Sequence, residues 1–317
     1  MSKISVPVSD SDQTVDCIVR FHDARRLAEL QRCVFSLFGQ RHRPLVVHLM
    51  LQRFTAAQVA AVNSVLAPLT QLPGAPEFDV CNWDEPGNAD ARTALLNAGM
   101  RRAEGRYVGF LDYDDVLFPE AYELLVGRLR ASGAAIAFGS VQEMEVELRG
   151  DVQRTLGKKT PNYSGQSLAD LFAANFCPIH SYLIDRRQVD AETLVFDNSL
   201  AIEEDYDLLL RICAAYPSDF ALLGTTLGYY FYKTDGSNTV AGQRGLDGER
   251  LQQYRVVQAR IRQRKATTRV APAVQTALGV RTPRHGANIL DVLTTARSPV
   301  GWPARLRVWA AARLERA

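Results

Sequence analysis

The sequence lacks several features that would point to a membrane-spanning, secreted or disulfide-built protein. No apolar run approaches the ~20 residues that a transmembrane helix needs. The first 13 residues are polar and acidic, without the apolar core of a signal peptide. The five cysteines are scattered and include no C-x-x-C pair, so neither a disulfide framework nor a cysteine zinc site is expected. We therefore expect buried, reduced thiols and a cytoplasmic location.

Net charge is also small, but it conceals an uneven distribution. The 317 residues carry a formal charge of only +2. Residues 250–317 contain 14 Lys and Arg but only two acidic residues, whereas the rest of the chain contains 23 basic and 33 acidic residues. The length and an ordinary composition, 47% hydrophobic and 23% charged, allow one large α/β domain with an appendage. A basic tail on an acidic body favours an anionic partner surface.

Apolar runs and helical spacings alternate along the first half of the chain. Runs rich in Val, Ile and Leu predict strands, and apolar residues three and four apart predict helices. Such alternation predicts a doubly wound, mostly parallel sheet. The predicted strands are residues 16–21, 44–51, 78–82, 107–111 and 139–146, and the predicted helices are residues 26–39, 56–66, 89–103, 119–131 and 249–264. We expect loops at 149–165 and 265–288, and Pro119 at the first position of its helix.

Residues 107–115 change abruptly from an apolar run to a cluster of acids. Five residues typical of a buried strand are followed by three carboxylates within four positions. In open α/β sheets, ligands bind at the carboxyl ends of strands. Residues two apart in extended chain point to one side, so Asp112 and Asp114 are expected to face one site together. Two such carboxylates need a cation or a donor between them, and oxygen ligands favour Mg²⁺ or Mn²⁺ over zinc.

The residues before this cluster extend the pattern. Asn97-x-Gly-Met-x-x-Ala-x-Gly105 is followed by Tyr-Val-Gly-Phe-Leu-Asp-Tyr-Asp-Asp115. Together they resemble the N-x-G, A-x-G and F-L-D-x-D-D core of family 2 glycosyltransferases of the GT-A fold. The resemblance extends over roughly residues 15–240. It implies a nucleoside-diphosphate sugar donor, with a UDP-sugar as the first expectation, and a Mn²⁺ or Mg²⁺ cofactor. By this resemblance Asp114 binds the metal, and Asp112 holds the ribose or supports the metal.

A second acidic stretch lies about ninety residues further on. Glu203-Glu-Asp-Tyr-Asp-Leu-Leu-Leu-Arg211 resembles the family's E-D-x-D helix start, whose first Asp is the general base. The resemblance assigns this role to Asp205, with Glu204 orienting it or binding acceptor. A helix N-terminus favours a charged carboxylate, as a base requires before reaction. Acids also occur in first helical turns for this reason alone.

Four further residues are predicted to contact substrates. The resemblance places Arg92 near the donor nucleotide, where a helix N-terminus attracts phosphate, and a surface salt bridge is the alternative. His180 lies in an N-x-x-P-x-H-S segment that lines the acceptor pocket in the family and precedes a strand at 182–185. Lys233 stands where the family has an Arg near the diphosphate. Asp23 follows an unusual first-strand end and is expected either to bind the base or ribose or to form a plain turn.

The second strand also departs from the family, because Leu51-Gln52-Arg53 replaces the usual base-binding Asp. We expect a glycosyltransferase domain over residues 1–247 and a basic, mostly helical extension over 248–317. Residues 298–317 could form an amphipathic helix that either meets a membrane surface or docks on the body or a second copy.

The sequence thus predicts an inverting, metal-dependent glycosyltransferase. Its acceptor is expected to be a glycan or a lipid-linked glycan of bacterial surface polysaccharide synthesis, at the inner membrane face. Nucleic acid is not an expected partner, and a homodimer is possible. The altered strand ends keep open a catalytically inactive scaffold or binding module. A nucleotidyl- or phosphotransferase is a further alternative, although the Gly-rich phosphate loop common in such enzymes is absent.

Overall fold

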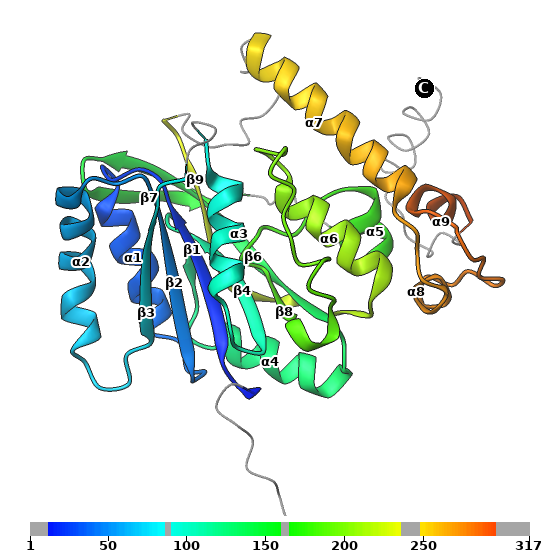
Figure 1. The fold of residues 1–317 in the computed structure, drawn as a ribbon, viewed down its shortest axis with the longest axis horizontal. Coiled ribbons are helices and arrows are strands. Elements are labelled where there is room, and N and C mark those ends of the chain that lie inside the picture. Colours follow the sequence, from blue (N-terminus) through cyan, green and yellow to red (C-terminus); the bar gives the residue numbers. More distant parts are fainter. Residues whose placement is uncertain (1–11, 86–89, 160–164, 236–247, 296–317) are drawn as a thin grey trace, which may run out of the picture.

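A nine-stranded sheet with helices on both faces forms the body of the protein in the computed structural model (Figure 1). The structure describes residues 12–85, 90–159, 165–235 and 248–295. The strand order is β3-β2-β1-β4-β8-β6-β9-β5, with β7 paired to β6. This arrangement confirms the expected α/β fold class.

The first half of the sheet is parallel and follows the predicted alternation. Neighbouring strands β3, β2, β1 and β4 all run the same way. Thr55 and Gln58 form the capping box that starts the second helix. The elements are β1 (Val15–Phe21), α1 (Leu27–Phe38), β2 (Leu45–Gln52), α2 (Ala56–Thr70), β3 (Glu77–Trp83), α3 (Arg92–Arg102) and β4 (Tyr107–Asp112).

The second half of the sheet is mixed. Strand β8 is antiparallel to both β4 and β6, β9 is parallel to β6, and β5 is antiparallel to β9. The loop expected at 149–165 is wrong in part, because β7 pairs with the end of β6 to form a hairpin. The elements are β5 (Val116–Leu117), α4 (Ala121–Ser132), β6 (Ile136–Arg149), β7 (Val152–Lys158), α5 (Leu168–Ala173), β8 (Tyr182–Asp185), α6 (Glu204–Ala215) and β9 (Ser218–Lys233).

The start of α4 also differs from the expectation. Pro119 is not the first helical residue, because the helix begins at Ala121 with Glu120 as its N-cap. The backbone carbonyl of Pro119 instead accepts a hydrogen bond from Arg41 N at 2.7 Å. Pro119 therefore belongs to the turn that ties β5 to the region after α1.

Two hydrophobic clusters lie on the two faces of the sheet. Alternate residues of one strand enter different clusters: Ile18 packs with α3 and α6, whereas Cys17 and Val19 pack with α1 and α4. This alternation follows from the two-residue period of a strand. Strands β1, β2 and β4 are therefore buried on both sides, which explains their largely apolar sequences, whereas the edge strand β3 is mostly half-exposed.

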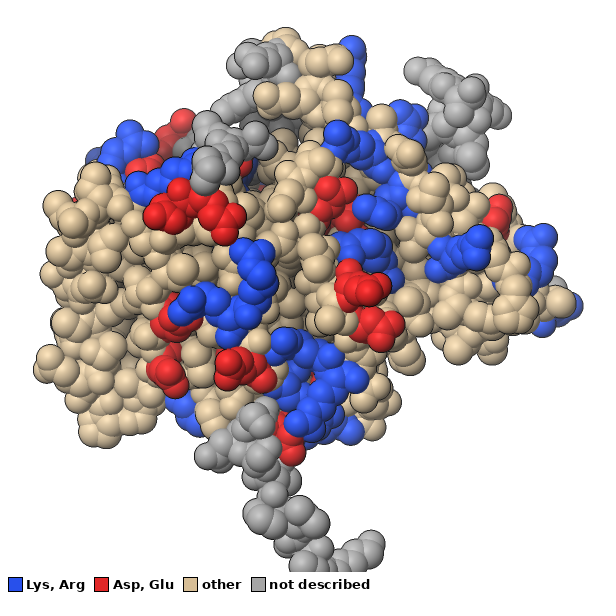
Figure 2. Space-filling model, in the orientation of Figure 1, with Lys and Arg blue, Asp and Glu red and all other residues tan. Residues whose placement is uncertain are grey.

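The described part of the predicted extension is helical and packs on the body. It contains α7 (Gly248–Thr267), α8 (Pro272–Ala277) and α9 (Ile289–Thr295), so a loop throughout 265–288 is wrong. Val257, Ile261 and Ile289 belong to the same apolar cluster as α5 and α6. Three basic residues of α7 are exposed, namely Arg255, Arg260 and Arg262, whereas Lys265 is buried and Arg264 pairs with Asp207 (Figure 2 shows the Lys and Arg side chains).

Other expectations for this end of the chain are not tested. The amphipathic helix expected at 298–317 lies outside the described residues, and the division at 247/248 stays a prediction. No helix within the described residues is long and apolar enough to cross a bilayer.

The packing of α7 generates a stability prediction. Ile261 is 3% exposed, whereas Val256 on the same helix is 46% exposed. We expect Ile261→Ala to lower the free energy of unfolding by ~2–5 kcal/mol, because buried contacts are lost and a cavity remains. Val256→Ala is the matched control and should change it by less than ~0.5 kcal/mol. Urea unfolding measures both, and equal effects would contradict the docking of α7.

Candidate active site

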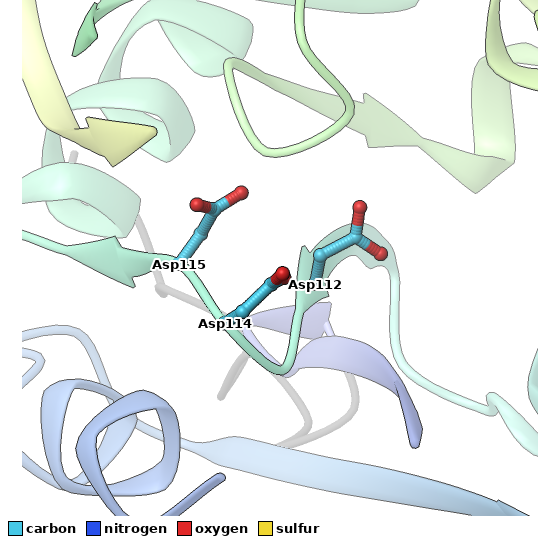
Figure 3. A group of neighbouring side chains, drawn as sticks. All are labelled: Asp112, Asp114 and Asp115. Carbon is cyan, nitrogen blue, oxygen red and sulfur yellow. The ribbon is translucent and has the colours of Figure 1, made fainter. Parts of the chain in front are cut away.

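Three aspartates project from the turn that follows β4 (Figure 3). Asp112 ends the strand, and Asp114 and Asp115 follow it before β5. One ligand oxygen from each lies within 4.8 Å of those of the other two. Asp115 is 2% exposed and accepts a hydrogen bond from Phe231 N at 2.8 Å. Burial, followed by the charges of Asp114 and Asp112, raises the pKa of Asp115 well above its usual value.

Arg20 joins this turn to the start of α6. The β1–β4 register pairs Arg20 with Asp112. The guanidinium donates hydrogen bonds to both carboxylate oxygens of Asp112, with Nε 2.6 Å from Oδ1 and Nη2 3.1 Å from Oδ2. Its third nitrogen, Nη1, donates to Glu204 Oε1. Burial alone would raise the pKa of Asp112, but the attraction of Arg20 outweighs it and the pKa is lowered.

The sequence analysis did not single out Arg20 as a site residue. One signal was available, because Arg20 is a charged residue near the carboxyl end of a strand whose other residues, apart from Asp16, are apolar. A cation at the carboxyl end of a central strand is costly to bury without a partner. The identity of that partner depends on strand register, which the sequence did not give.

Asp205 lies in the first turn of α6, as predicted, but its electrostatic state differs from the expectation. We expected the helix N-terminus to favour the charged carboxylate. Burial and then the charge of Glu204 instead raise the pKa of Asp205 to about 8. A hydrogen bond from Tyr206 N, at 2.7 Å, works in the opposite direction but is outweighed. A carboxyl group of this kind can accept a proton near neutral pH far more readily than an ordinary Asp.

A cleft of about 250 Å³ lies between the turn after β4 and the start of α6. Five of the predicted site residues line it, together with Arg20. Tyr254 of α7 lies on its wall as well, so the segment beyond 247 contributes to the cleft. The predicted residues in the lining are Arg92, Asp112, His180, Glu204 and Asp205. Asp23, Asp114 and Lys233 are not among the residues that line it.

His180 is buried beside the acidic turn. Its Nδ1 lies 3.5 Å from Asp115 Oδ2, and its ring stacks on Tyr230 with centroids 6.4 Å apart. Burial lowers the pKa of His180 to about 4, despite the nearby charges of Asp112 and Asp114. The imidazole is therefore neutral at physiological pH and offers a hydrogen bond but no charge.

Arg92 and Asp23 lie at the donor side of the expected site, each in a local ion pair. Arg92 begins α3 and contacts Asp90 at 2.7 Å, while its side chain also lines the cleft. Asp23 contacts Arg25 at 2.8 Å and accepts from Arg25 N at 3.1 Å. The Arg25 contact lowers the pKa of Asp23. The contacts of Asp23 are those of a turn, the second of the two interpretations that the sequence left open.

Lys233 contacts the acidic turn directly, where a donor diphosphate contact was expected. It ends β9, is 3% exposed, and forms an ion pair with Asp114. Its Nζ also lies 3.6 Å from Oε1 of Glu29, a buried residue of α1. Glu29 was not singled out in the sequence, where it is one acid of a helical first turn.

The oxygen donors of the turn fit a hard divalent cation. Three carboxylates converge, and no soft ligand is among them, which suits Mn²⁺ or Mg²⁺. Two of the three are at the same time neutralised by tethered cations, Asp112 by Arg20 and Asp114 by Lys233. A bound metal would therefore share these carboxylates with Arg20 and Lys233.

Comparison with known proteins adds independent findings. Residues 85–190 match the family model described as "Glycosyl transferase family 2". The succinoglycan biosynthesis protein ExoO of Rhizobium meliloti (strain 1021) is 27% identical over 154 aligned residues, covering 44% of this chain and 42% of ExoO. The chain therefore spans less than half the length of that relative.

Two groups of solved structures share the fold. S. aureus TarS superimposes with a TM-score of 0.53 at 12% identity, over 69% of this chain and 37% of TarS. A TarS fragment in complex with UDP-GlcNAc gives 0.52 at 10% identity, over 82% of this chain and 68% of the fragment. The mannosyltransferase PcManGT of Pyrobaculum calidifontis, in complex with GDP-Man and Mn²⁺, gives 0.51 at 14% identity, over 95% and 84%.

The raised pKa of Asp205 generates a prediction about stability and pH. An unfolded Asp titrates near ~3.9, whereas the pKa of the folded Asp205 is raised to about 8. Between these values the folded state binds the extra proton, so this residue's contribution to stability falls as pH rises. Asp205→Asn removes that titration. We expect the melting temperature of the variant minus that of wild type to increase from about pH 5 to about pH 9. Parallel curves would contradict the raised pKa.

Proposed function

We propose that this chain, whose residues 85–190 match the family 2 glycosyltransferase model, is an inverting, metal-dependent glycosyltransferase of the GT-A fold. It moves a sugar from a nucleoside-diphosphate sugar to a hydroxyl acceptor. The observation that supports this most strongly is that Asp112 and Asp115 of the acidic turn and Asp205 of α6 line one cleft. A donor held at the turn and an acceptor held near α6 would meet there.

Asp205 is the proposed general base. It removes the proton of the acceptor hydroxyl while the oxygen attacks the anomeric carbon and the nucleoside diphosphate leaves. One displacement inverts the anomeric configuration and needs no covalent intermediate. The raised pKa suits this role, because a base works best when its pKa lies near the working pH. Glu204, held by Arg20, keeps the first turn of α6 in place beside Asp112.

Asp114 and Asp112 are the proposed holders of Mn²⁺ or Mg²⁺. When bound, such a cation would neutralise charge on the diphosphate leaving group. Arg92, at the N-terminus of α3, is proposed to contact the donor nucleotide from the other side. Asp23 is given no donor contact in this proposal, because its carboxylate forms a turn with Arg25 and does not line the cleft. We had assigned Lys233 to the diphosphate, but its contacts with Asp114 and Glu29 give a different role, described below.

We propose a UDP-sugar donor first, since TarS binds UDP-GlcNAc, with a GDP-sugar as the other choice, since PcManGT binds GDP-Man.

The acceptor is proposed to be a growing or lipid-linked glycan of a surface polysaccharide, in line with the succinoglycan role of ExoO. The neutral His180 would donate a hydrogen bond to it. The exposed basic residues of α7 would favour work at the inner face of the cell membrane, because anionic lipids attract them.

A panel of nucleoside-diphosphate sugars with Mn²⁺ tests the function. Release of a free nucleoside diphosphate, with transfer to water or to an added glycan acceptor, supports the proposal. Altered phosphate products would indicate a nucleotidyl- or phosphotransferase, and absence of turnover with every donor would indicate a binding module. The increase in melting temperature with each member of the same panel identifies the donor for the experiments on the Asp205 and Asp114 variants.

Asp205→Asn separates chemistry from binding. Loss of the base should reduce transfer by ~10²–10⁴-fold, while donor affinity stays near wild type. In wild type, transfer should also rise with pH up to about 8, where Asp205 loses its proton, and this limb should vanish in the variant. Asp219→Asn is the matched control, because Asp219 pairs with Arg128 away from the cleft. Near-normal transfer by Asp205→Asn would exclude it as the base.

Asp114→Ala tests the metal assignment. The substitution removes one hard ligand and one negative charge, so Mn²⁺-dependent binding of the nucleoside diphosphate should be abolished. Titration calorimetry with and without Mn²⁺ measures this. Asp151→Ala, at the exposed turn between β6 and β7, is the control and should bind as wild type does. Unchanged metal-dependent affinity in Asp114→Ala would remove Asp114 from the metal site.

A further inference from the structure

Lys233 is held between two carboxylates in the interior of the protein. It forms an ion pair with Asp114 on one side and lies 3.6 Å from Glu29 on the other. Lys233 is 3% exposed and Glu29 is 5% exposed. A buried ammonium group is retained only where negative charge compensates its lost hydration. Packing alone therefore does not account for a lysine at this position.

Glu29 has partners of its own that keep it in place without Lys233. Arg26 forms a two-nitrogen contact with it, with Nη2 2.6 Å from Oε1. The same Arg26 donates to the hydroxyl of Tyr113 at 3.2 Å, and Tyr113 lies between Asp112 and Asp114 in the acidic turn. Lys233 and Arg26 thus form a formally neutral group with the carboxylates of Asp114 and Glu29. Of these two carboxylates, only Asp114 is proposed to bind the metal. The ammonium of Lys233 can shift its contact from Asp114 towards Glu29 without becoming unpaired.

We propose that Lys233 is a tethered competitor for the divalent cation, and that Glu29 is the carboxylate that receives it when a metal takes Asp114. The pair Lys233–Glu29 then determines the metal affinity of the acidic turn. Without metal, Lys233 neutralises Asp114 and limits repulsion within the turn. The inference uses the Asp114 assignment of the proposed function but makes a different claim, since Lys233 is given no contact with the donor.

The test measures binding of Mn²⁺ alone to the full chain, by the electron paramagnetic resonance signal of free Mn²⁺. Lys233→Met keeps an apolar chain of similar length but removes the competing charge. We expect it to bind Mn²⁺ about tenfold more tightly or better, because a contact-distance charge is removed from the ligand. Glu29→Gln should act in the opposite direction. It withdraws the alternative partner of Lys233, so the ammonium stays on Asp114 and Mn²⁺ binds several-fold more weakly.

Arg32→Met controls for charge acting through space. Arg32 lies on α1, one turn beyond Glu29, and its side chain donates to Gln153 and not to the acidic turn. The Arg32→Met substitution should raise Mn²⁺ affinity by no more than about twofold, since a more distant charge interacts less strongly with the bound ion. Circular dichroism confirms that each variant is folded.

Several results would overturn the proposal. One is Mn²⁺ binding by Lys233→Met that is unchanged, weaker or absent. A second is an increase in Mn²⁺ affinity in Arg32→Met as large as that in Lys233→Met. A third is an increase in Mn²⁺ affinity in Glu29→Gln. If Lys233→Met fails to fold, the Glu29→Gln and Arg32→Met comparison decides the matter alone. No nucleotide or acceptor is present, so the outcome is independent of whether the chain transfers a sugar. A separate titration with the nucleoside diphosphate distinguishes the original assignment: lost affinity for it in Lys233→Met, with unchanged Mn²⁺ affinity, would show that Lys233 contacts the diphosphate.

Discussion

Repulsion among carboxylates at one edge of the sheet is the constraint on which this site depends. Three aspartates follow β4 and three acids open α6, all close to the carboxyl ends of the parallel strands. Like charges at such distances cannot all ionise in a partly buried site unless cations offset them. Arg20 supplies one positive charge, shared by Asp112 and Glu204, and Lys233 supplies another at Asp114.

The two aspartates without a tethered cation are the ones with raised pKa values. Burial, followed by the charges of neighbouring carboxylates, raises the pKa values of both Asp115 and Asp205, whereas the attraction of Arg20 lowers that of Asp112. Identical carboxyl groups whose surroundings give them different pKa values can perform different chemical roles. Under the proposed function, the separation suits Asp112 to the donor and metal and Asp205 to the proton of the acceptor.

The segment after residue 247 takes part in this arrangement, although the family model matches only residues 85–190. Tyr254 of α7 lines the cleft, and Gln258 of α7 donates to Glu203 at 2.8 Å, at the residue that caps α6. Further along, Arg264 Nε lies 2.5 Å from Asp207. The wall of the cleft near the start of α6 therefore includes a helix that the family resemblance did not reach.

Local pattern by itself determined the parallel half of the sheet, the acidic turn and the helix that begins near Asp205. Each of these depends on residues within a few positions: the two-residue alternation of a strand, the spacing of a helix, or the change from apolar chain to carboxylates after 111. The same local rules missed β7 and α8, where apolar patterning is weak and pairing with β6 or packing on α6 supplies the stability.

Only the tertiary structure decided which charges meet. Arg20 and Glu204 are 184 positions apart, and Lys233 and Asp114 are 119 apart. Both contacts follow from strand register and from the docking of α1 and α6 at the sheet edge. The pKa of Asp205 was misjudged for the same reason, because burial and neighbouring charge depend on the whole fold, whereas the helix N-terminus is visible in sequence. Local interactions are specified by neighbours along the chain; electrostatic ones extend through space and depend on where distant segments are placed.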